Sequence, residues 1–284
     1  MDAPTAGVLR DVTLLASLAM LAGSAAYKWL RVTRPSECWH WSGRVDARPY
    51  TGVDAVVVAA LTVMIFGVLG MPETAEPAEA AKQHSELSAP MVMAGIVVQL
   101  IGGALLLFYL GGVRGLSPAA LFGLRGRSWP RVLGAAVLLM PPTLVLVNAL
   151  AEGMAVWMQS FWPEMQAQEA VRAFRDSDDP VARGALVLAA VVVAPLVEEL
   201  AFRGFIYGFL KRFTDGWFAA LCSSLLFAVA HFHVGSLFPL ALLALILCAA
   251  YEITGSLLAP MLMHALFNTT SLLLLVYAPE MTTP

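Results

Sequence analysis

Two acidic residues and one arginine lie inside an almost wholly apolar stretch of the sequence. The run 182–212 is long enough to cross a bilayer as a helix, yet it contains Glu198, Glu199 and Arg203. Each ionisable side chain near the centre of a bilayer costs roughly 2.5–3.5 kcal/mol on insertion scales. Three such residues close together therefore need partners, water or a chemical function.

The spacing separates the two glutamates. Glu199 and Arg203 are four residues apart, so a carboxylate and a guanidinium meet on one helix face, and an ion pair that lets the helix insert is one interpretation. Glu198 lies about 100° further round the helix, so Arg203 cannot easily pair with both acids. A buried carboxylate without a charged partner is a candidate general base or metal ligand.

The following apolar runs add two histidines and an asparagine. Phe227 and His231 are four residues apart, as are His264 and Asn268, and each pair shares one helix face. A single histidine inside a membrane is more often a hydrogen bond between helices than a ligand. Two histidines, an asparagine and a glutamate in adjacent spans favour a functional cluster.

Two hydrolytic arrangements fit these groups, and one alternative belongs to another class. Glu198 and His231 can polarise a water while His264 and Asn268 donate hydrogen bonds to a developing oxyanion. Glu198, His231 and His264 can instead hold zinc, with one position open for water. The alternative is a non-catalytic membrane scaffold or a proton-coupled transporter in which the same cluster relays protons.

Membrane helices must position these residues. Hydrophobic residues make up 59% of the sequence and charged residues 13%, against about a quarter charged in soluble domains. The net charge of −3 and the lack of a basic stripe give no reason to expect nucleic acid as a partner. We predict an all-α, polytopic transmembrane helix bundle of about eight spans. The apolar runs lie near 11–30, 52–71, 91–113, 131–151, 183–209, 216–232, 237–254 and 256–277.

The motifs divide the chain into three expected regions. Residues 1–151 form a four-span region without a recognised motif. Residues 152–183 form an amphipathic connector at the membrane interface, with a helix from Pro163 to Phe174. The alternative is that this helix is a lid or substrate-guiding helix over a site. Residues 184–284 form a four-span core that contains every motif.

Charge in the loops predicts the orientation. Loops rich in lysine and arginine alternate with poorer ones, which places the rich loops in the cytoplasm and both termini outside. The rich loops are 28–51, 114–131 and 210–215; the poorer ones are 72–90 and 152–183. Asp54 and Glu252 lie at span ends, where we expect both carboxylates to face headgroups.

This orientation creates one conflict. Counted along ideal helices, Glu198 and His264 lie nearer the cytoplasmic side, whereas His231 comes out near the opposite face. Either the span that carries His231 is displaced and broken around that residue, or the orientation of residues 210–236 is wrong.

The order EExxxR, FxxxH and HxxxN, on three of the last four spans, resembles the CAAX-protease and bacteriocin-processing family of intramembrane proteases. The resemblance covers roughly residues 183–277. It implies that Glu198 activates a water with His231 as its partner, and that His264 and Asn268 stabilise the oxyanion. The remaining motif residues would support the site or bind the substrate: Glu199, Arg203 and Phe227.

The resemblance also sets the expected activity and location. Family members have been described as metalloproteases and as glutamate-dependent enzymes without an obligatory metal, so zinc stays open. We expect a multi-pass protein of the inner (plasma) membrane. Its expected reaction is hydrolysis of a peptide bond in a membrane-associated or lipidated peptide or protein, and a bacterial membrane peptide is favoured over a CAAX protein.

Overall fold

The computed structural model describes residues 28–29, 32–34, 43–69, 88–125, 128–159, 171, 174–175 and 177–277. These residues form helices and connecting segments, with no strand among them, which confirms the expected all-α fold. The elements are α2 Asp54–Leu69, α4 Ala89–Phe108, η2 Tyr109–Val113, α5 Pro118–Leu121, α6 Trp129–Gln159, α8 Pro180–Leu188, η3 Ala189–Val193, α9 Ala194–Glu199, η4 Leu200–Tyr207, α10 Gly208–Phe213, α11 Gly216–Val229, η5 Val234–Ser236, α12 Leu237–Thr254 and α13 Leu258–Tyr277.

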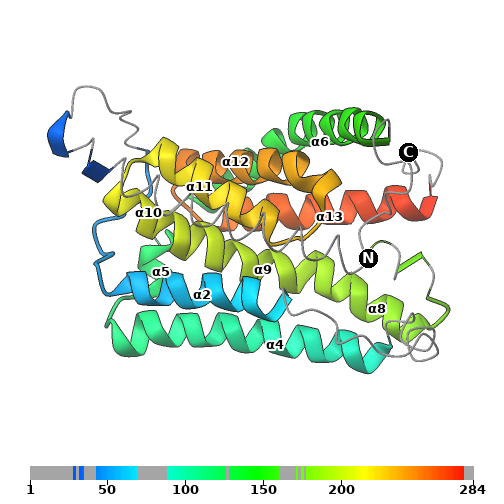
Figure 1. Ribbon diagram of the computed structural model, residues 1–284, viewed down its shortest axis with the longest axis horizontal. Helices are drawn as coiled ribbons and strands as arrows, with labels where there is room; N and C mark the ends of the chain where they lie inside the picture. Colours follow the sequence, from blue (N-terminus) through cyan, green and yellow to red (C-terminus); the bar gives the residue numbers. More distant parts are fainter. Residues whose placement is uncertain are drawn as a thin grey trace.

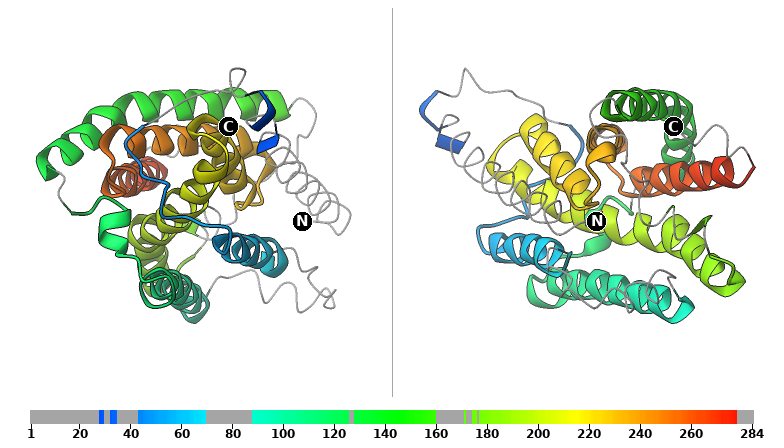
Figure 2. Two further views of the ribbon diagram at one scale, coloured as in Figure 1. Left: turned by 90° about the vertical axis from the view of Figure 1, so that its left-hand side faces the viewer. Right: turned by 45° about the vertical axis from the view of Figure 1, so that its right-hand side comes forward.

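One long helical rod runs through the middle of the bundle. It consists of α8, η3, α9, η4 and α10 in unbroken succession (Figure 1). Helices α2 and α4 lie on one side of the rod, and α6, α11, α12 and α13 lie on the other (Figures 1 and 2). Helix α4 contacts α8 and α9, whereas α13 contacts η3 and α9, and α11 contacts η4. The rod is therefore covered by neighbours along most of its length.

Membrane-length helices account for most of the described chain. Within the described residues, five helices are long and apolar enough to cross a bilayer: Ala89–Val113, Trp129–Met158, Pro180–Phe213, Val234–Thr254 and Leu258–Tyr277. Two shorter apolar helices, Asp54–Val63 and Gly216–Val229, accompany them. This confirms a multi-pass bundle of about eight helices. The expected span 11–30 and the expected helix Pro163–Phe174 fall almost entirely outside the described residues.

The central rod contains two π-helical segments, and its sequence explains the first. Pro195 has no amide hydrogen to donate to the carbonyl of Val191, so a regular α-helical ladder cannot continue there. The π-helical η3 segment directly precedes this proline. Such segments occur often at functional sites. The second, η4, begins directly after Glu199.

Helix α11 is too short to span the hydrocarbon core. Its 14 residues rise roughly 21 Å, against about 30 Å of hydrocarbon, and it ends at Val229. The chain then turns through Phe232, whose φ of 50° is left-handed, and returns as η5 and α12. The structure thus takes the first of the two alternatives for His231: its span is broken before that residue is reached.

The prediction that Asp54 and Glu252 face headgroups is wrong. Both side chains are buried. Asp54 forms an ion pair with Arg114 at 2.9 Å, and Glu252 forms one with Lys211. Both basic partners come from the loops rich in positive charge or from the helix end beside them. Their side chains reach back into the fold and neutralise the two acids, which lowers the free-energy cost of burying them.

The three segments rich in basic residues meet at one end of the bundle. Lys211 donates from Nζ to the carbonyl of Val45 at 2.9 Å, and Arg114 donates from Nη2 to the carbonyl of Pro49 at 3.0 Å. These contacts join residues of 28–51, 114–131 and 210–215. The arrangement is consistent with placing all three segments on one side of the membrane.

Candidate active site

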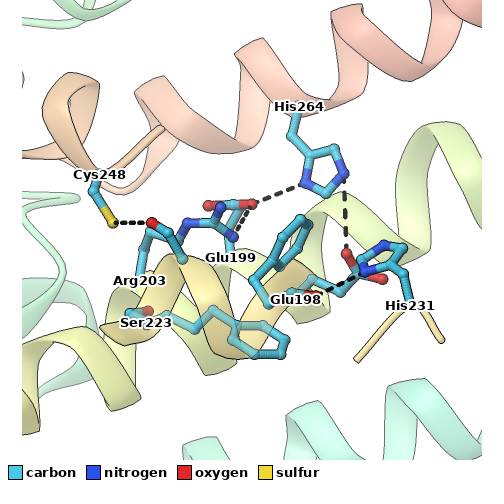
Figure 3. A network of polar contacts seen from close by, with 10 residues as sticks. Glu198, Glu199, Arg203, Ser223, His231, Cys248 and His264 are labelled. Carbon is cyan, nitrogen blue, oxygen red and sulfur yellow. Dashed lines mark hydrogen bonds and ion pairs between the residues drawn. The ribbon is translucent and has the colours of Figure 1, made fainter. Parts of the chain in front are cut away.

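Helices from three parts of the chain bring the motif residues together. Helix α9 and segment η4 supply the two glutamates and the arginine, α11 supplies Phe227, the turn after α11 supplies His231, and α13 supplies His264 (Figure 3). The three motifs lie far apart in the sequence and converge around one ring, that of Phe227.

Glu199 lies at the centre of a buried charge network. Its Oε1 atom accepts from Nη1 of Arg203 at 2.9 Å and lies 2.8 Å from Nδ1 of His264. The side chains of Glu199 and Arg203 are fully buried, and His264 is almost so. The ion pair expected from the four-residue spacing is present. A histidine from another helix joins it.

Glu198 differs from Glu199 in its exposure and its partners. Its side chain is 24% exposed, and its Oε2 atom lies 3.9 Å from Nε2 of His264 (Figure 3). This oxygen is itself buried and has no hydrogen-bond partner among the residues that the structure describes. The gap is too long for a direct hydrogen bond, but one water about 2.8 Å from each atom can bridge it. Glu198 is therefore the carboxylate placed to hold a water.

The ring of Phe227 is the common wall of the site. The guanidinium carbon of Arg203 lies 4.3 Å from the ring centroid, and the ring of His231 lies 4.7 Å from it. The ring of His264 meets Phe227 nearly edge-on at 5.8 Å, and Phe202 does so at 5.2 Å. Phe227 thus fixes the positions of one cation and two imidazoles.

His231 is tied back to its own helix. Its Nδ1 atom lies 2.8 Å from the carbonyl oxygen of Phe227. A carbonyl only accepts hydrogen bonds, so Nδ1 carries the hydrogen and Nε2 of the neutral ring carries the lone pair. The backbone after Val229 therefore orients Nε2 of His231 as a hydrogen-bond acceptor.

Asn268 has a different partner from the expected oxyanion. Its Nδ2 atom donates to the carbonyl of Ala190 at 2.7 Å. Ala190 lies in the π-helical η3 segment, so Asn268 pins α13 to the irregular part of the central rod. A side-chain amide has two N–H donors, and this bond uses one of them.

The donor set does not form a ready zinc site. Nδ1 of His231 and Nδ1 of His264 are each bonded within the protein, which leaves the two Nε2 atoms as the ring nitrogens that could reach a metal. In the part of the chain that the structure describes, no group of three or more His, Cys, Asp or Glu side chains is placed to hold one metal ion. Glu198 and His264 face each other as two donors, whereas zinc takes three protein ligands at a catalytic site.

The sequence patterns do not predict two features of the site. The contact between His264 and Glu199 joins separate helices, whose relative rotation no spacing within one helix defines. The second is incomplete pairing: Oε2 of Glu199 and the Nε and Nη2 atoms of Arg203 are buried without hydrogen-bond partners. The buried charge of Glu199 is the sequence signal for its contact with His264. The spacing of Glu199 and Arg203 already accounts for that charge, so it does not predict a second partner.

Comparisons with known proteins bear on the same region. Residues 180–270 match the family model described as Type II CAAX prenyl endopeptidase Rce1-like. The chain is 29% identical over 84 residues to the "Putative membrane peptidase YdiL" of Bacillus subtilis (strain 168), which covers 30% of this chain and 34% of that protein. It is 39% identical over 92 residues to an uncharacterized 24.3 kDa protein of Escherichia coli, which covers 31% of this chain and 42% of that protein.

The matches are partial, and the match to the family model lies on the motifs. The chain spans only 34% and 42% of the lengths of these two relatives. No solved structure matches. The matched region contains the whole cluster around Phe227, and it confirms the resemblance drawn from EExxxR, FxxxH and HxxxN. Residues 180–270 therefore match an Rce1-like domain, and they lie within a multi-pass membrane protein.

Proposed function

We propose that this protein is an intramembrane endopeptidase that hydrolyses a peptide bond with a water held between Glu198 and His264. One observation carries the proposal: Oε2 of Glu198 is buried, lacks a hydrogen-bond partner, and faces Nε2 of His264 across 3.9 Å. A general base must reach its proton directly or through one water, and this spacing suits a water in contact with both groups.

Glu198 is the base because Glu199 is committed elsewhere. Glu199 is fully buried, and one of its oxygens serves both Arg203 and His264. Protonating it would weaken two charge-assisted contacts at once. Glu198 has partial exposure and no charged partner closer than the imidazole. Its carboxylate can take up a proton and release it during each turnover.

Glu199 orients His264. A carboxylate on Nδ1 fixes the tautomer in which Nδ1 carries the hydrogen, so Nε2 of the neutral ring presents its lone pair toward Glu198. A carboxylate behind an imidazole holds the ring in orientation and stabilises its protonated form, as in serine hydrolase triads. Arg203 in turn holds Glu199. Arg203 therefore supports Glu199, Glu199 orients His264, and His264 holds the water.

The proposed reaction proceeds by direct attack of water. Glu198 accepts one proton from the water while Nε2 of His264 accepts a hydrogen bond from the other. The water oxygen forms a bond to the carbonyl carbon of the substrate, and the carbonyl oxygen becomes an oxyanion. The proton on Glu198 then passes to the amide nitrogen, the C–N bond breaks, and the products are a carboxylic acid and an amine.

The other motif residues serve this reaction. Asn268 retains one N–H donor, which we assign to the oxyanion. His231 presents Nε2 as an acceptor from the turn after α11, and since both hydrogens of the water are used, we assign it to an N–H group of the substrate. Phe227 keeps both imidazoles and Arg203 in place through its ring contacts.

The substrate class follows from the surroundings and the family. The cluster lies among membrane-length helices, so the scissile bond must reach it from a membrane-bound chain. The Rce1-like match adds lipidated proteins with a CAAX-type terminus to the candidates. We propose a membrane-associated or lipidated peptide or protein as substrate. We place the enzyme in the inner (plasma) membrane of a bacterial cell.

Mass spectrometry of new protein termini tests this proposal. Membranes from cells that express the wild-type chain are compared with membranes from cells that express Glu198→Gln at the same level. We expect a set of cleavage sites in membrane proteins or peptides that disappears in the variant. Identical termini in both samples would refute the proposal. If the termini were identical, and the wild-type protein took up protons in proteoliposomes while Glu198→Gln did not, the transporter alternative would replace the protease proposal.

A further inference from the structure

A segment outside the Rce1-like domain lies against its central rod. We call residues 43–54 the strap. It leads into α2, of which Asp54 is the first residue, and crosses the end of the bundle where the basic segments meet. Side chains and backbone of the strap contact η2, η4, α10 and α12. The strap therefore links the N-terminal half of the chain to the helix that carries the catalytic glutamates.

The first end of the strap is held by Glu252. Its Oε2 atom accepts from the amide of Val45 at 3.0 Å, and its carbonyl accepts from the amide of Arg44 at 3.2 Å. Lys211 bonds both the Glu252 carboxylate and the carbonyl of Val45. A Cβ atom on Gly43 would lie 1.9 Å from Oε2 of Glu252, so only glycine permits this approach.

The second end is held by Arg114. This residue forms an ion pair with Asp54 at 2.9 Å and donates to the carbonyl of Pro49 at 3.0 Å. Asp54 also accepts from the hydroxyl of Tyr109 at 2.7 Å and from the amide of Thr51 at 2.6 Å. Two acid–base pairs, each with a buried carboxylate, thus fix the strap on both sides of its middle.

Tyr50 lies between these two anchors and touches the π-helical turn of the active site. It is almost fully buried, and its hydroxyl donates to the carbonyl of Gly204 in η4. Its ring lies against Gly208, where an added Cβ would be 2.5 Å from a ring carbon. The ring also meets Phe205 nearly edge-on at 5.8 Å. The absence of a side chain at Gly208 lets the tyrosine approach the helix backbone.

Gly204 directly follows Arg203 in the π-helical segment. A π-helix departs from the regular α-helical ladder, and such segments occur often at functional sites. Tyr50 donates a hydrogen bond to this segment next to Arg203, the residue that holds Glu199 and lies over Phe227. A shift of this turn would move the guanidinium of Arg203 and, through Glu199, the imidazole of His264.

We propose that Tyr50 is a positioning residue for the active site: its bond to Gly204 holds the η4 turn where Arg203 supports Glu199 and His264. The proposal rests on the proposed function for its kinetic consequence. The structural consequence, the protection of η4, stands independently of any activity.

The first test compares Tyr50→Phe with Tyr109→Phe. Tyr109 is a matched control because it meets the same Phe205 ring at 6.0 Å and donates a hydroxyl hydrogen bond, but to Asp54 and not to η4. The substrate is the peptide that spans the strongest Glu198-dependent cleavage site. We expect kcat of Tyr50→Phe to fall about three- to tenfold with an unchanged KM, and kcat of Tyr109→Phe to stay at the wild-type value. A wild-type kcat in Tyr50→Phe, or equal losses in both variants, would overturn the proposal.

The second test does not require a substrate. Hydrogen exchange of the purified protein is measured over residues 200–207 in both variants. Faster exchange of this segment in Tyr50→Phe alone supports the proposal, whereas unchanged exchange overturns it. Gly208→Ala, which displaces the tyrosine ring, should speed exchange in the same segment. If Glu198-dependent cleavage is absent while this exchange pattern appears, the proposed function fails and the positioning role is retained.

Discussion

Nδ1 of His264 lies 2.8 Å from Oε1 of Glu199, the same oxygen that accepts from Arg203 at 2.9 Å. This arrangement places a buried anion between a cation and an imidazole. The anion then serves to orient the histidine, and the neighbouring Glu198 remains available to a water. The proposed mechanism therefore gives the two adjacent glutamates separate functions, and substitution should distinguish them.

Glu198→Gln should abolish turnover without weakening the fold. Glutamine keeps the size of the side chain but cannot accept the proton, so we expect kcat to fall about a hundred- to ten-thousand-fold. Thermal unfolding in detergent should be unchanged, because Oε2 of Glu198 has no partner to lose. Residual activity close to wild type would remove Glu198 from its role as base.

Glu199→Ala should instead weaken the fold. It leaves the guanidinium of Arg203 buried without a counter-charge, which costs about 3–5 kcal/mol of unfolding free energy. The double variant Glu199→Leu with Arg203→Met removes both charges and should be more stable than Glu199→Ala alone. The measurement is denaturant unfolding of all three proteins. A double variant no more stable than Glu199→Ala would show that the two residues do not act as a pair.

Phe227→Leu should lower both stability and kcat. Leucine keeps most of the volume but loses the aromatic face under Arg203, a contact that contributes about 0.5–2 kcal/mol. Both imidazoles lose their common wall, so turnover falls as well. Phe209→Leu is the control, since Phe209 pairs with Phe213 at 4.9 Å, outside the cluster. It should reduce stability but keep kcat; an equal fall in kcat would contradict the role of Phe227.

Chelation should leave the activity intact. The proposed reaction uses Glu198 and His264 without a metal, so dialysis against a strong chelator is expected to leave kcat within about twofold of its starting value. The control adds zinc to the dialysed protein. Loss of activity on dialysis and its return with zinc would replace the proposed water with one bound to a metal held by Glu198, His231 and His264.

The sequence predicts interactions within one helix well, because their geometry is local. The spacing of Glu199 and Arg203 predicts their ion pair, and the apolar runs predict the helices. Interactions between helices are predicted less well. The contact of His264 with Glu199 depends on the rotation of α13 against the rod, which the π-helical segments η3 and η4 alter. The same irregularity exposes the carbonyl of Ala190 to Asn268.

Asp54 and Glu252 show a second limit of sequence patterns. Their positions at span ends predict exposure to headgroups, but the pairing partners Arg114 and Lys211 are distant in sequence. In the sequence, each of these two basic residues is explained equally well as a loop charge that sets the orientation in the membrane. Only the fold shows that these charges also neutralise buried acids and anchor the segment before α2.

Helix α11 ends at Val229 after 14 residues, and His231 follows in the turn beyond it. A helix roughly 9 Å shorter than the hydrocarbon core creates a local mismatch with the lipid. The bilayer beside this hairpin must become thinner, or water must fill the space between the end of the helix and the membrane surface. A bilayer with shorter acyl chains would reduce that mismatch, and the depth at which His231 meets a substrate would then follow the thickness of the surrounding membrane.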